Sequence, residues 1–206
     1  ARLVGKYLKG TGALRGRQLV EVSRPDLVGR YVGHTAPLTN QVIRSALGGV
    51  LFIDEAYSLY RGKDDSFGLE AIDTLVKGME DHRDDLVVIL AGYSKEMEQF
   101  LTANSGLASR FPNKIEFPDY TGEELWRILE LSAKGRGYRL AEGCQTPLTE
   151  YFTRAQAENA DENGNGRMAR NLLERAILNQ SRRLAAEPQA ALDELTLGDF
   201  ALEEAE

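Results

Sequence analysis

Two adjacent carboxylates follow a short apolar stretch in the first half of the chain. Residues 50–53 are Val-Leu-Phe-Ile, and Asp54 and Glu55 come directly after them. Four apolar residues in a row predict a strand buried on both faces, which tolerates two charges only where it ends in solvent. Open α/β sheets bind ligands at the carboxyl ends of their strands. We therefore interpret Asp54 as a residue that holds Mg²⁺ through water and Glu55 as one that polarises an attacking water. The alternative is a buried strand that happens to end in an acidic turn.

The segments around this pair alternate between apolar strands and amphipathic helices. Further strands are predicted at 18–22, 86–91 and 114–117, and helices at 1–9, 39–47, 67–79, 95–101 and 107–111, with a loop at 27–35 and a polar loop at 57–66. Strand–helix alternation with continuous apolar strands predicts a parallel sheet with helices on both faces.

The pattern changes after Pro118. Thr121 and Glu124 have the spacing of a capping box, which predicts the start of a helix. Amphipathic helices are predicted at 121–133, 146–158 and 168–184, with a flexible polar link at 161–166 and no convincing strand. We expect an α/β domain over 1–118 and an all-helical domain over 119–206.

Composition narrows the classes of protein that the chain can belong to. The chain has 206 residues and a formal net charge of −7, which argues against a general nucleic-acid or membrane-surface binder. The single cysteine, Cys144, excludes an internal disulfide and fits a reducing, cytoplasmic compartment. No apolar run approaches the roughly 20 residues that span a bilayer. We expect neither nucleic-acid binding nor membrane insertion.

Five stretches, in one order along the chain, resemble the AAA+ ATPases. They are LVEVSRPDLVGRYVGHTA (19–36), LGGVLFIDEAYSLYRG (47–62), AIDTLVKGMEDHRDDLVVILAGYSKEMEQFL (71–101), GLASRFPNKIEFPDYT (106–121) and GNGRMARNLLERA (164–176). Within the superfamily they are similar to the group of stage V sporulation protein K, the red-type Rubisco activase CbbX and the type VII secretion ATPase, and most of all to the first. The resemblance implies an AAA+ core followed by a small helical lid domain. It also implies hydrolysis of ATP with Mg²⁺ by a homo-oligomeric ring, expected to be a hexamer, that threads or remodels a protein substrate.

The resemblance assigns roles to residues that match the family's motifs. Asp54 and Glu55 match the Walker B pair, Asp54 as the metal and cofactor ligand and Glu55 as a catalytic residue. Arg110 matches the arginine finger, a catalytic residue that would reach the γ-phosphate of a neighbouring subunit; the alternative is a surface arginine at a helix end. Arg167 matches the sensor-2 arginine, and Arg170, three residues on, could share that cofactor-binding role. Either could instead be a solvated helix charge.

Two further motifs follow from the resemblance. Tyr31, Val32 and Gly33 match the aromatic pore loop that grips a polypeptide in the channel of the ring. An aromatic ring contacts many sequences, and glycines let such a loop move; the alternative is a core tyrosine beside a glycine turn. Tyr93 stands where many AAA+ proteins carry a polar sensor-1 residue, commonly Asn, so Tyr93 or Ser94 could orient water at the cofactor.

One motif of the family is not in the sequence. A P-loop, GxxxxGKS or GxxxxGKT, supplies backbone N–H groups and a lysine for the phosphates, and the 206 residues contain none. Either the chain is an N-terminally truncated piece of a complete ATPase, or the natural protein has lost the P-loop. A first residue inside a predicted helix favours truncation, with the first strand and the P-loop preceding Ala1. We expect the 206 residues alone to bind ATP poorly and hydrolyse it barely.

Two other classes of function are open at this point. The first is a non-catalytic AAA+-like scaffold that assembles or binds partners. The joint presence of Asp54, Glu55, Arg110 and Arg167 argues against it, since a scaffold has no need of all four. The second is an AAA+ protein that acts on DNA, which the acidic balance disfavours.

Overall fold

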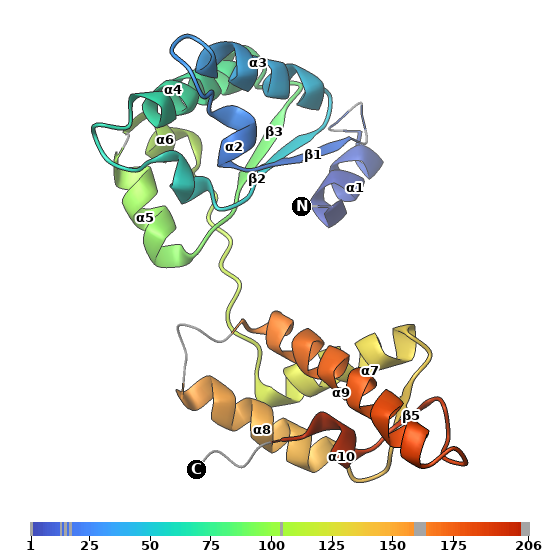
Figure 1. The fold of residues 1–206 in the computed structure, drawn as a ribbon. Helices are drawn as coiled ribbons and strands as arrows, with labels where there is room; N and C mark the ends of the chain where they lie inside the picture. The colour runs from blue at the N-terminus through green and yellow to red at the C-terminus, as the bar shows by residue number, and fades with distance from the viewer. Residues whose placement is uncertain are drawn as a thin grey trace. The chain divides into compact units, whose positions relative to one another are not determined.

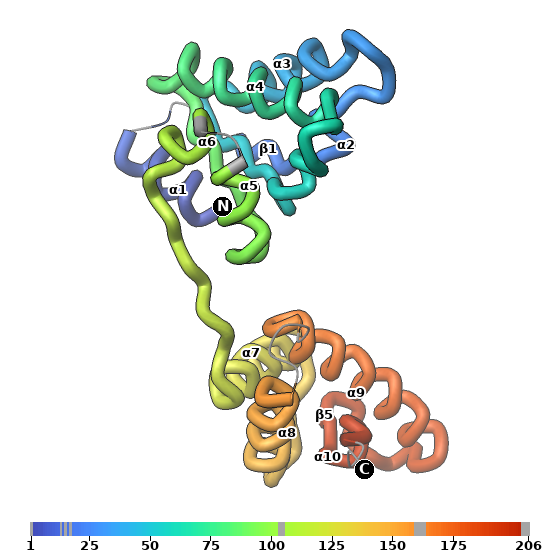
Figure 2. The backbone as a smooth tube through the Cα atoms, turned by 90° about the vertical axis from the view of Figure 1, so that its left-hand side faces the viewer, coloured from blue at the N-terminus to red at the C-terminus, as the bar shows by residue number. Residues whose placement is uncertain are grey.

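The chain divides into two compact units, Ala1–Glu116 and Phe117–Glu206 (Figures 1 and 2). The computed structural model describes residues 2–12, 14, 16, 18–103, 105–158 and 164–202. Of the predicted polar link at 161–166, residues 161–163 lie outside the described residues and Gly166 is the first residue of a helix. Each unit has a hydrophobic core of its own.

The first unit is built on a three-stranded parallel sheet in the order β1-β2-β3. Its strands are β1 (Leu19–Val22), β2 (Val50–Ile53) and β3 (Val87–Leu90). Val22 lies opposite Ile53, which lies opposite Leu90. Because the three strands point the same way, the residues that follow them lie at one edge of the sheet. The prediction of a parallel sheet with 50–53 as a buried strand is confirmed.

Helices flank this sheet. They are α1 (Arg2–Gly10), α2 (Arg24–Leu27), α3 (Thr35–Ala46), η1 (Ala56–Leu59, a 3₁₀ turn), α4 (Ser66–Asp81), α5 (Ser94–Ala103) and α6 (Ser105–Arg110). Leu51 and Ile53 belong to one core cluster with Ile43 of α3, while alternation along β2 turns Val50 to the opposite face. There Val50 Cγ2 lies 3.6 Å from where a Cβ on Gly5 of α1 would be. The two faces of β2 therefore contact different helices.

Three predictions about the first unit are wrong in detail. Residues 114–117 form no strand, and Ile115 and Phe117 are 74% and 88% exposed. A strand needs a neighbour that completes its hydrogen bonds, and none of the described strands pairs with this segment. Helix α3 begins at Thr35 rather than at 39, because a proline such as Pro37 is tolerated in a first helical turn. The predicted polar loop at 57–66 begins with η1.

The second unit is helical, as predicted, with one addition. It contains α7 (Gly122–Gly135), α8 (Gln145–Glu158), α9 (Gly166–Ala186) and α10 (Leu197–Phe200). The predicted capping box is present, since the Thr121 hydroxyl accepts from the Glu124 N–H at 3.3 Å and the Glu124 carboxylate accepts from the Thr121 N–H at 2.8 Å. The expectation of no further strand is wrong, because β4 (Arg139–Leu140) and β5 (Glu194–Leu195) form a parallel pair. Two residues are too few to show an alternating pattern in a sequence.

No described helix is both long and apolar enough to cross a membrane.

Candidate functional site

Asp54 and Glu55, the carboxylate pair, lie at the carboxyl end of β2, the middle strand of the sheet, and both are exposed. Neighbouring strands hold the backbone around them: the Asp54 N–H donates to Val22 O and the Ala56 N–H donates to Ala91 O, both at 2.9 Å. Asp54 Oδ1 accepts from the Glu55 N–H at 3.1 Å. The sheet edge thus presents two carboxylates to solvent on a fixed backbone.

Glu55 has a left-handed backbone, with φ 47° and ψ 47°. This conformation costs a residue other than glycine roughly 1–2 kcal/mol. It turns the chain sharply from β2 into η1, which begins at the next residue. Strained residues persist where the surrounding structure holds them, and they cluster at functional sites. The strain therefore marks the same position that the sequence pattern selected.

Two tyrosines border the carboxylate pair. The ring centroids of Tyr57, in η1, and Tyr93, after β3, are 6.4 Å apart. Burial, and then the nearby Glu55 carboxylate, raise the pKa of the Tyr57 phenol above its ordinary value, so the phenol stays neutral. A Cβ on Gly92 would lie 2.7 Å from Tyr57 Cδ1 and 2.9 Å from Met97 Sδ, so any larger residue here would displace one of these side chains. The structure thus brings Tyr93 to the site.

Tyr57 is a site residue that the sequence interpretation missed. The sequence predicts a polar loop at 57–66, whereas Tyr57 belongs to η1 and is partly buried. The signal available was an aromatic residue two positions after the carboxylate pair.

The carboxylate pair fits one kind of metal site better than others. Among the described residues, no group of three or more His, Cys, Asp and Glu side chains could hold a metal ion together. Mg²⁺ keeps several waters and is commonly held by one or two carboxylates together with phosphate oxygens of a substrate. The donor set therefore suits the magnesium of a nucleotide rather than a cage made by protein alone.

Arg110 lies away from the carboxylate pair. It ends α6, where its Nη2 forms an ion pair with Glu80 and its Nη1 donates to Gly106 O at 3.1 Å. Its Nε is buried and has no hydrogen-bond partner among the described residues. Glu80 lies about 21 Å along α4 from Ser66, the first residue of that helix. Leu59 of η1 lies at the Ser66 end, beside Gly68. Within one chain, the structure does not bring Arg110 to Asp54 and Glu55.

The loop between α2 and α3 is exposed at its tip. Tyr31 is 68% and Val32 87% exposed, and Gly33 has φ 78°. The Tyr31 ring contacts His34 edge-on, with centroids 5.5 Å apart. The alternative of a core tyrosine is therefore wrong for the chain by itself.

Arg167 and Arg170 are exposed on the first turns of α9, in the second unit. Asn165 holds the start of this helix in place: its Oδ1 accepts from the Tyr120 N–H at 3.2 Å and its Nδ2 donates to Asp119 at 3.0 Å. Both arginines lie on a supported helix end, with their side chains in solvent.

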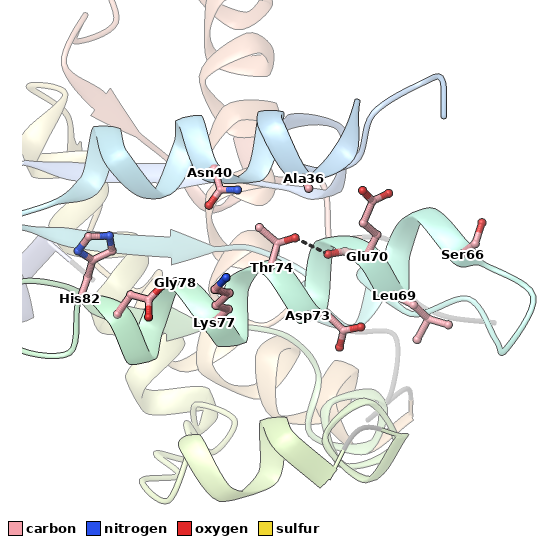
Figure 3. Close-up of a pocket in the computed structure, with 11 residues that line it drawn as sticks. Ala36, Asn40, Ser66, Leu69, Glu70, Asp73, Thr74, Lys77, Gly78 and His82 are labelled. Atoms are coloured by element: carbon pink, nitrogen blue, oxygen red, sulfur yellow. Dashed lines mark hydrogen bonds between the residues drawn. The ribbon is translucent and has the colours of Figure 1, made fainter. Parts of the chain in front are cut away.

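A groove of about 710 Å³ lies between α3 and α4 (Figure 3). Its lining is mixed, with Glu70, Asp73, Lys77 and Asp81 of α4 beside apolar Ala36 and Leu69. The Thr74 hydroxyl donates to the Glu70 carbonyl at 2.7 Å, a bond that Figure 3 marks with a dashed line. None of the described residues that line it is a predicted site residue. The groove is a feature separate from the carboxylate pair.

Comparison with protein families agrees with this arrangement. Residues 1–119 match the ATPase family associated with various cellular activities (AAA), and residues 121–206 match the AAA lid domain. The chain belongs to the AAA ATPases. The predicted resemblance and the predicted fold class are confirmed.

Curated relatives fall in the predicted group. The chain is 46% identical to stage V sporulation protein K of Bacillus subtilis (strain 168) over 185 residues, which are 89% of this chain and 58% of that protein. It is 43% identical to the chloroplastic ribulose bisphosphate carboxylase/oxygenase activase of Cyanidioschyzon merolae, over 96% of this chain and 67% of that protein. It is 45% identical to the protein CbbX of Cereibacter sphaeroides, over 94% and 62%. The AAA chain thus spans about three fifths of the length of these relatives.

A solved structure supports the fold. The crystal structure of the FIGL-1 AAA domain in complex with ADP matches with a TM-score of 0.57 at 18% identity, covering 88% of this chain and 60% of that one. At this identity the likeness concerns the arrangement of the backbone alone.

Proposed function

We propose that the protein hydrolyses ATP with Mg²⁺ in a homo-oligomeric ring, expected to be a hexamer, and uses the reaction to thread or remodel a protein substrate. One observation carries the proposal: an AAA-family chain presents two exposed carboxylates, one of them on strained backbone, at the carboxyl end of its middle strand. Residues 1–118 would be the ATP-binding core and 119–206 the lid. Neither nucleic acid nor a membrane is part of the proposed function.

The two residues of the carboxylate pair would have different roles. Asp54 would hold the magnesium ion through water, and Glu55 would accept the proton of the attacking water as a general base. When bound, the metal ion would neutralise part of the negative charge on the phosphates. Tyr93 would help to orient water and nucleotide beside Glu55, where the neutral Tyr57 phenol provides a partly buried neighbour.

The arginines would act from other surfaces. Because Arg110 is held at the far end of α4, it can complete a nucleotide site only in a neighbouring subunit, which supports a role as an arginine finger. Arg167, with Arg170 on the same helix, would contact the phosphates from the lid. Both suggested roles use a planar, permanently charged group that matches phosphate geometry.

The decisive experiment is Glu55→Gln in the protein encoded by the complete gene, because the 206 residues contain no P-loop motif. Removing a general base is expected to slow hydrolysis at least about 100-fold, while nucleotide binding and assembly are preserved. Glu130→Gln, an exposed glutamate on α7, is the control and should hydrolyse ATP normally. Unchanged hydrolysis in Glu55→Gln would exclude the proposed base, and an unaltered protein that binds partners without hydrolysing ATP would favour the scaffold.

The exposed loop tip suggests where substrate is gripped. Tyr31→Ala is expected to leave ATP hydrolysis within about twofold, because the ring lies outside the nucleotide site, and to abolish ATP-dependent retention of an unfolded, fluorophore-labelled model polypeptide. Leu131→Ala, which truncates an apolar side chain that is also 68% exposed, is the control. Normal retention by Tyr31→Ala would refute a role for residues 31–33 in gripping the substrate.

A further inference from the structure

Arg24 connects three segments that are far apart in the sequence. It is the first residue of α2, directly after β1 and Ser23. Its Nη1 donates to two carbonyls of η1, Ser58 O at 2.8 Å and Leu59 O at 3.1 Å. The same guanidinium forms a two-bond ion pair with Asp65, at 2.7 Å and 3.0 Å. One side chain thus joins α2, η1 and the start of α4.

The Arg24–Asp65 ion pair lies in a closely packed part of the first unit. The side chains of Arg24 and Asp65 are each only 15% exposed. Asp65 is also the N-cap of α4, accepting from the Gly68 N–H at 3.1 Å, and the hydrogen bond from Arg24 holds the pKa of its carboxyl below the usual range. A Cβ on Gly68 would lie 2.1 Å from Leu59 O. Only glycine at this position lets α4 approach the η1 carbonyls so closely.

One end of this connection is the carboxylate pair. Ser58 and Leu59 belong to the 3₁₀ turn that begins at Ala56, the residue after Glu55. The carbonyls that Arg24 holds thus lie three and four residues after Glu55, so a change in the left-handed backbone of Glu55 would reach them through this single turn.

The other end is the loop that carries Tyr31. Helix α2 ends at the fully buried Leu27, whose carbonyl accepts from the Thr39 hydroxyl of α3 at 2.8 Å. The Gly29 N–H donates to the Thr35 hydroxyl at 3.1 Å, which closes the base of the loop. Since α2 has only four residues, a displacement of Arg24 would also displace Leu27 and the first residues of the loop.

We infer that Arg24 is a positioning residue that couples the backbone at Glu55 to the Tyr31 loop. The inference rests on the proposed function for its purpose, but the physical linkage can be tested without nucleotide. Arginine suits the place because its rigid fork bonds a carboxylate and two carbonyls at once, which a lysine ammonium on a flexible stem does not reproduce.

The linkage is tested by amide hydrogen exchange in the 206-residue chain, with the perturbation placed at the distant partner. Asp65→Asn keeps an N-cap residue, because Asn caps helices as well as Asp does, but removes the charge that Arg24 binds. Exchange in residues 25–36 is expected to quicken about tenfold, as the weakened contact lets the linked segments open locally. Asp64→Asn, which neutralises the exposed neighbouring aspartate, should change nothing there.

A double variant assigns the effect to Arg24. In an Arg24→Gln background, Asp65→Asn is expected to add no further exchange in 25–36, because the connection is already broken. Unaltered exchange in 25–36 on Asp65→Asn, or an undiminished effect in the Arg24→Gln background, would overturn the inference.

The coupling itself is tested in the protein encoded by the complete gene. A slowly hydrolysed ATP analogue is expected to change exchange in 25–36 of the unaltered protein, and this response should vanish in Arg24→Gln while analogue binding persists. A persisting response would overturn the coupling. Failure of the unaltered protein to bind the analogue would instead overturn the proposed function, and the result with Asp65→Asn would still decide the linkage.

Discussion

Glu55 combines a strained backbone with an exposed side chain at the end of the middle strand. Strain of this kind lowers stability, and a stability-optimised chain would place glycine here. The carboxylate is therefore kept at a cost to folding, which is what a residue with a chemical role is expected to show.

The cost can be measured by urea unfolding of the 206-residue chain. Glu55→Gly should be more stable than Glu55→Ala by about 1 kcal/mol, because glycine accepts the left-handed conformation and alanine does not. Alanine and glutamate share the strain, and the Glu55 side chain is exposed, so Glu55→Ala is expected to match the unaltered chain. Equal stabilities for the glycine and alanine variants would argue against strain at this residue.

At the scale of elements, the second unit depends on an ion pair between α9 and α10. Arg183 donates two hydrogen bonds of 2.9 Å to Asp199, which also accepts from the Thr196 N–H at 2.7 Å and is buried. Burial alone would raise the pKa of Asp199, but the hydrogen bonds from Arg183 and Thr196 outweigh it and lower the pKa below its ordinary value. These contacts fix the end of the unit next to β5.

This shift sets a dependence of stability on pH. Because the folded pKa is lowered, the ion pair contributes its full stability above about pH 5 and loses it as the pH falls through the ordinary pKa of about 3.9 towards the lower folded value. Asp199→Asn should lower the free energy of unfolding by about 3 kcal/mol at pH 7 and flatten the loss between pH 5 and 3. Fluorescence of Trp126, the single tryptophan, which lies in α7, reports this unfolding. Asp193→Asn, in an exposed pair with Arg139, should leave both quantities nearly unchanged.

At the scale of the whole molecule, the chain has two hydrophobic cores rather than one. Leu51 is fully buried in the first and Leu129 in the second. Separate cores predict separate unfolding transitions, since cooperative units follow contiguous packing.

Matched truncations test this separation. Leu51→Ala is expected to destabilise the first unit by about 3 kcal/mol. The midpoint temperature at which the first unit unfolds, measured by circular dichroism, should fall, while the thermal transition of Trp126 fluorescence should not move. Leu129→Ala should shift the Trp126 transition itself. A shift of Trp126 fluorescence in Leu51→Ala would mean that the two cores unfold together.

Local patterns in the sequence predicted most elements of both units. Continuous apolar runs marked β2 and β3, helical periodicity marked α4, α7 and α9, and the spacing of Thr121 and Glu124 marked the start of α7. The segment 114–117, Lys-Ile-Glu-Phe, alternates charged and apolar residues as an edge strand can, but it forms no strand, because a strand also requires a partner that no local pattern supplies.

The candidate site shows the same division. The sequence by itself determined that Asp54 and Glu55 follow a buried strand, because strand burial and the position of charges are written into adjacent residues. Only the tertiary structure decided the left-handed turn at Glu55, the Tyr57–Tyr93 contact, the pairing of Arg110 with Glu80, and the Arg24–Asp65 connection. Most of these join residues that are tens of positions apart, and which charges meet across such distances depends on how strands and helices pack, not on any spacing along the chain.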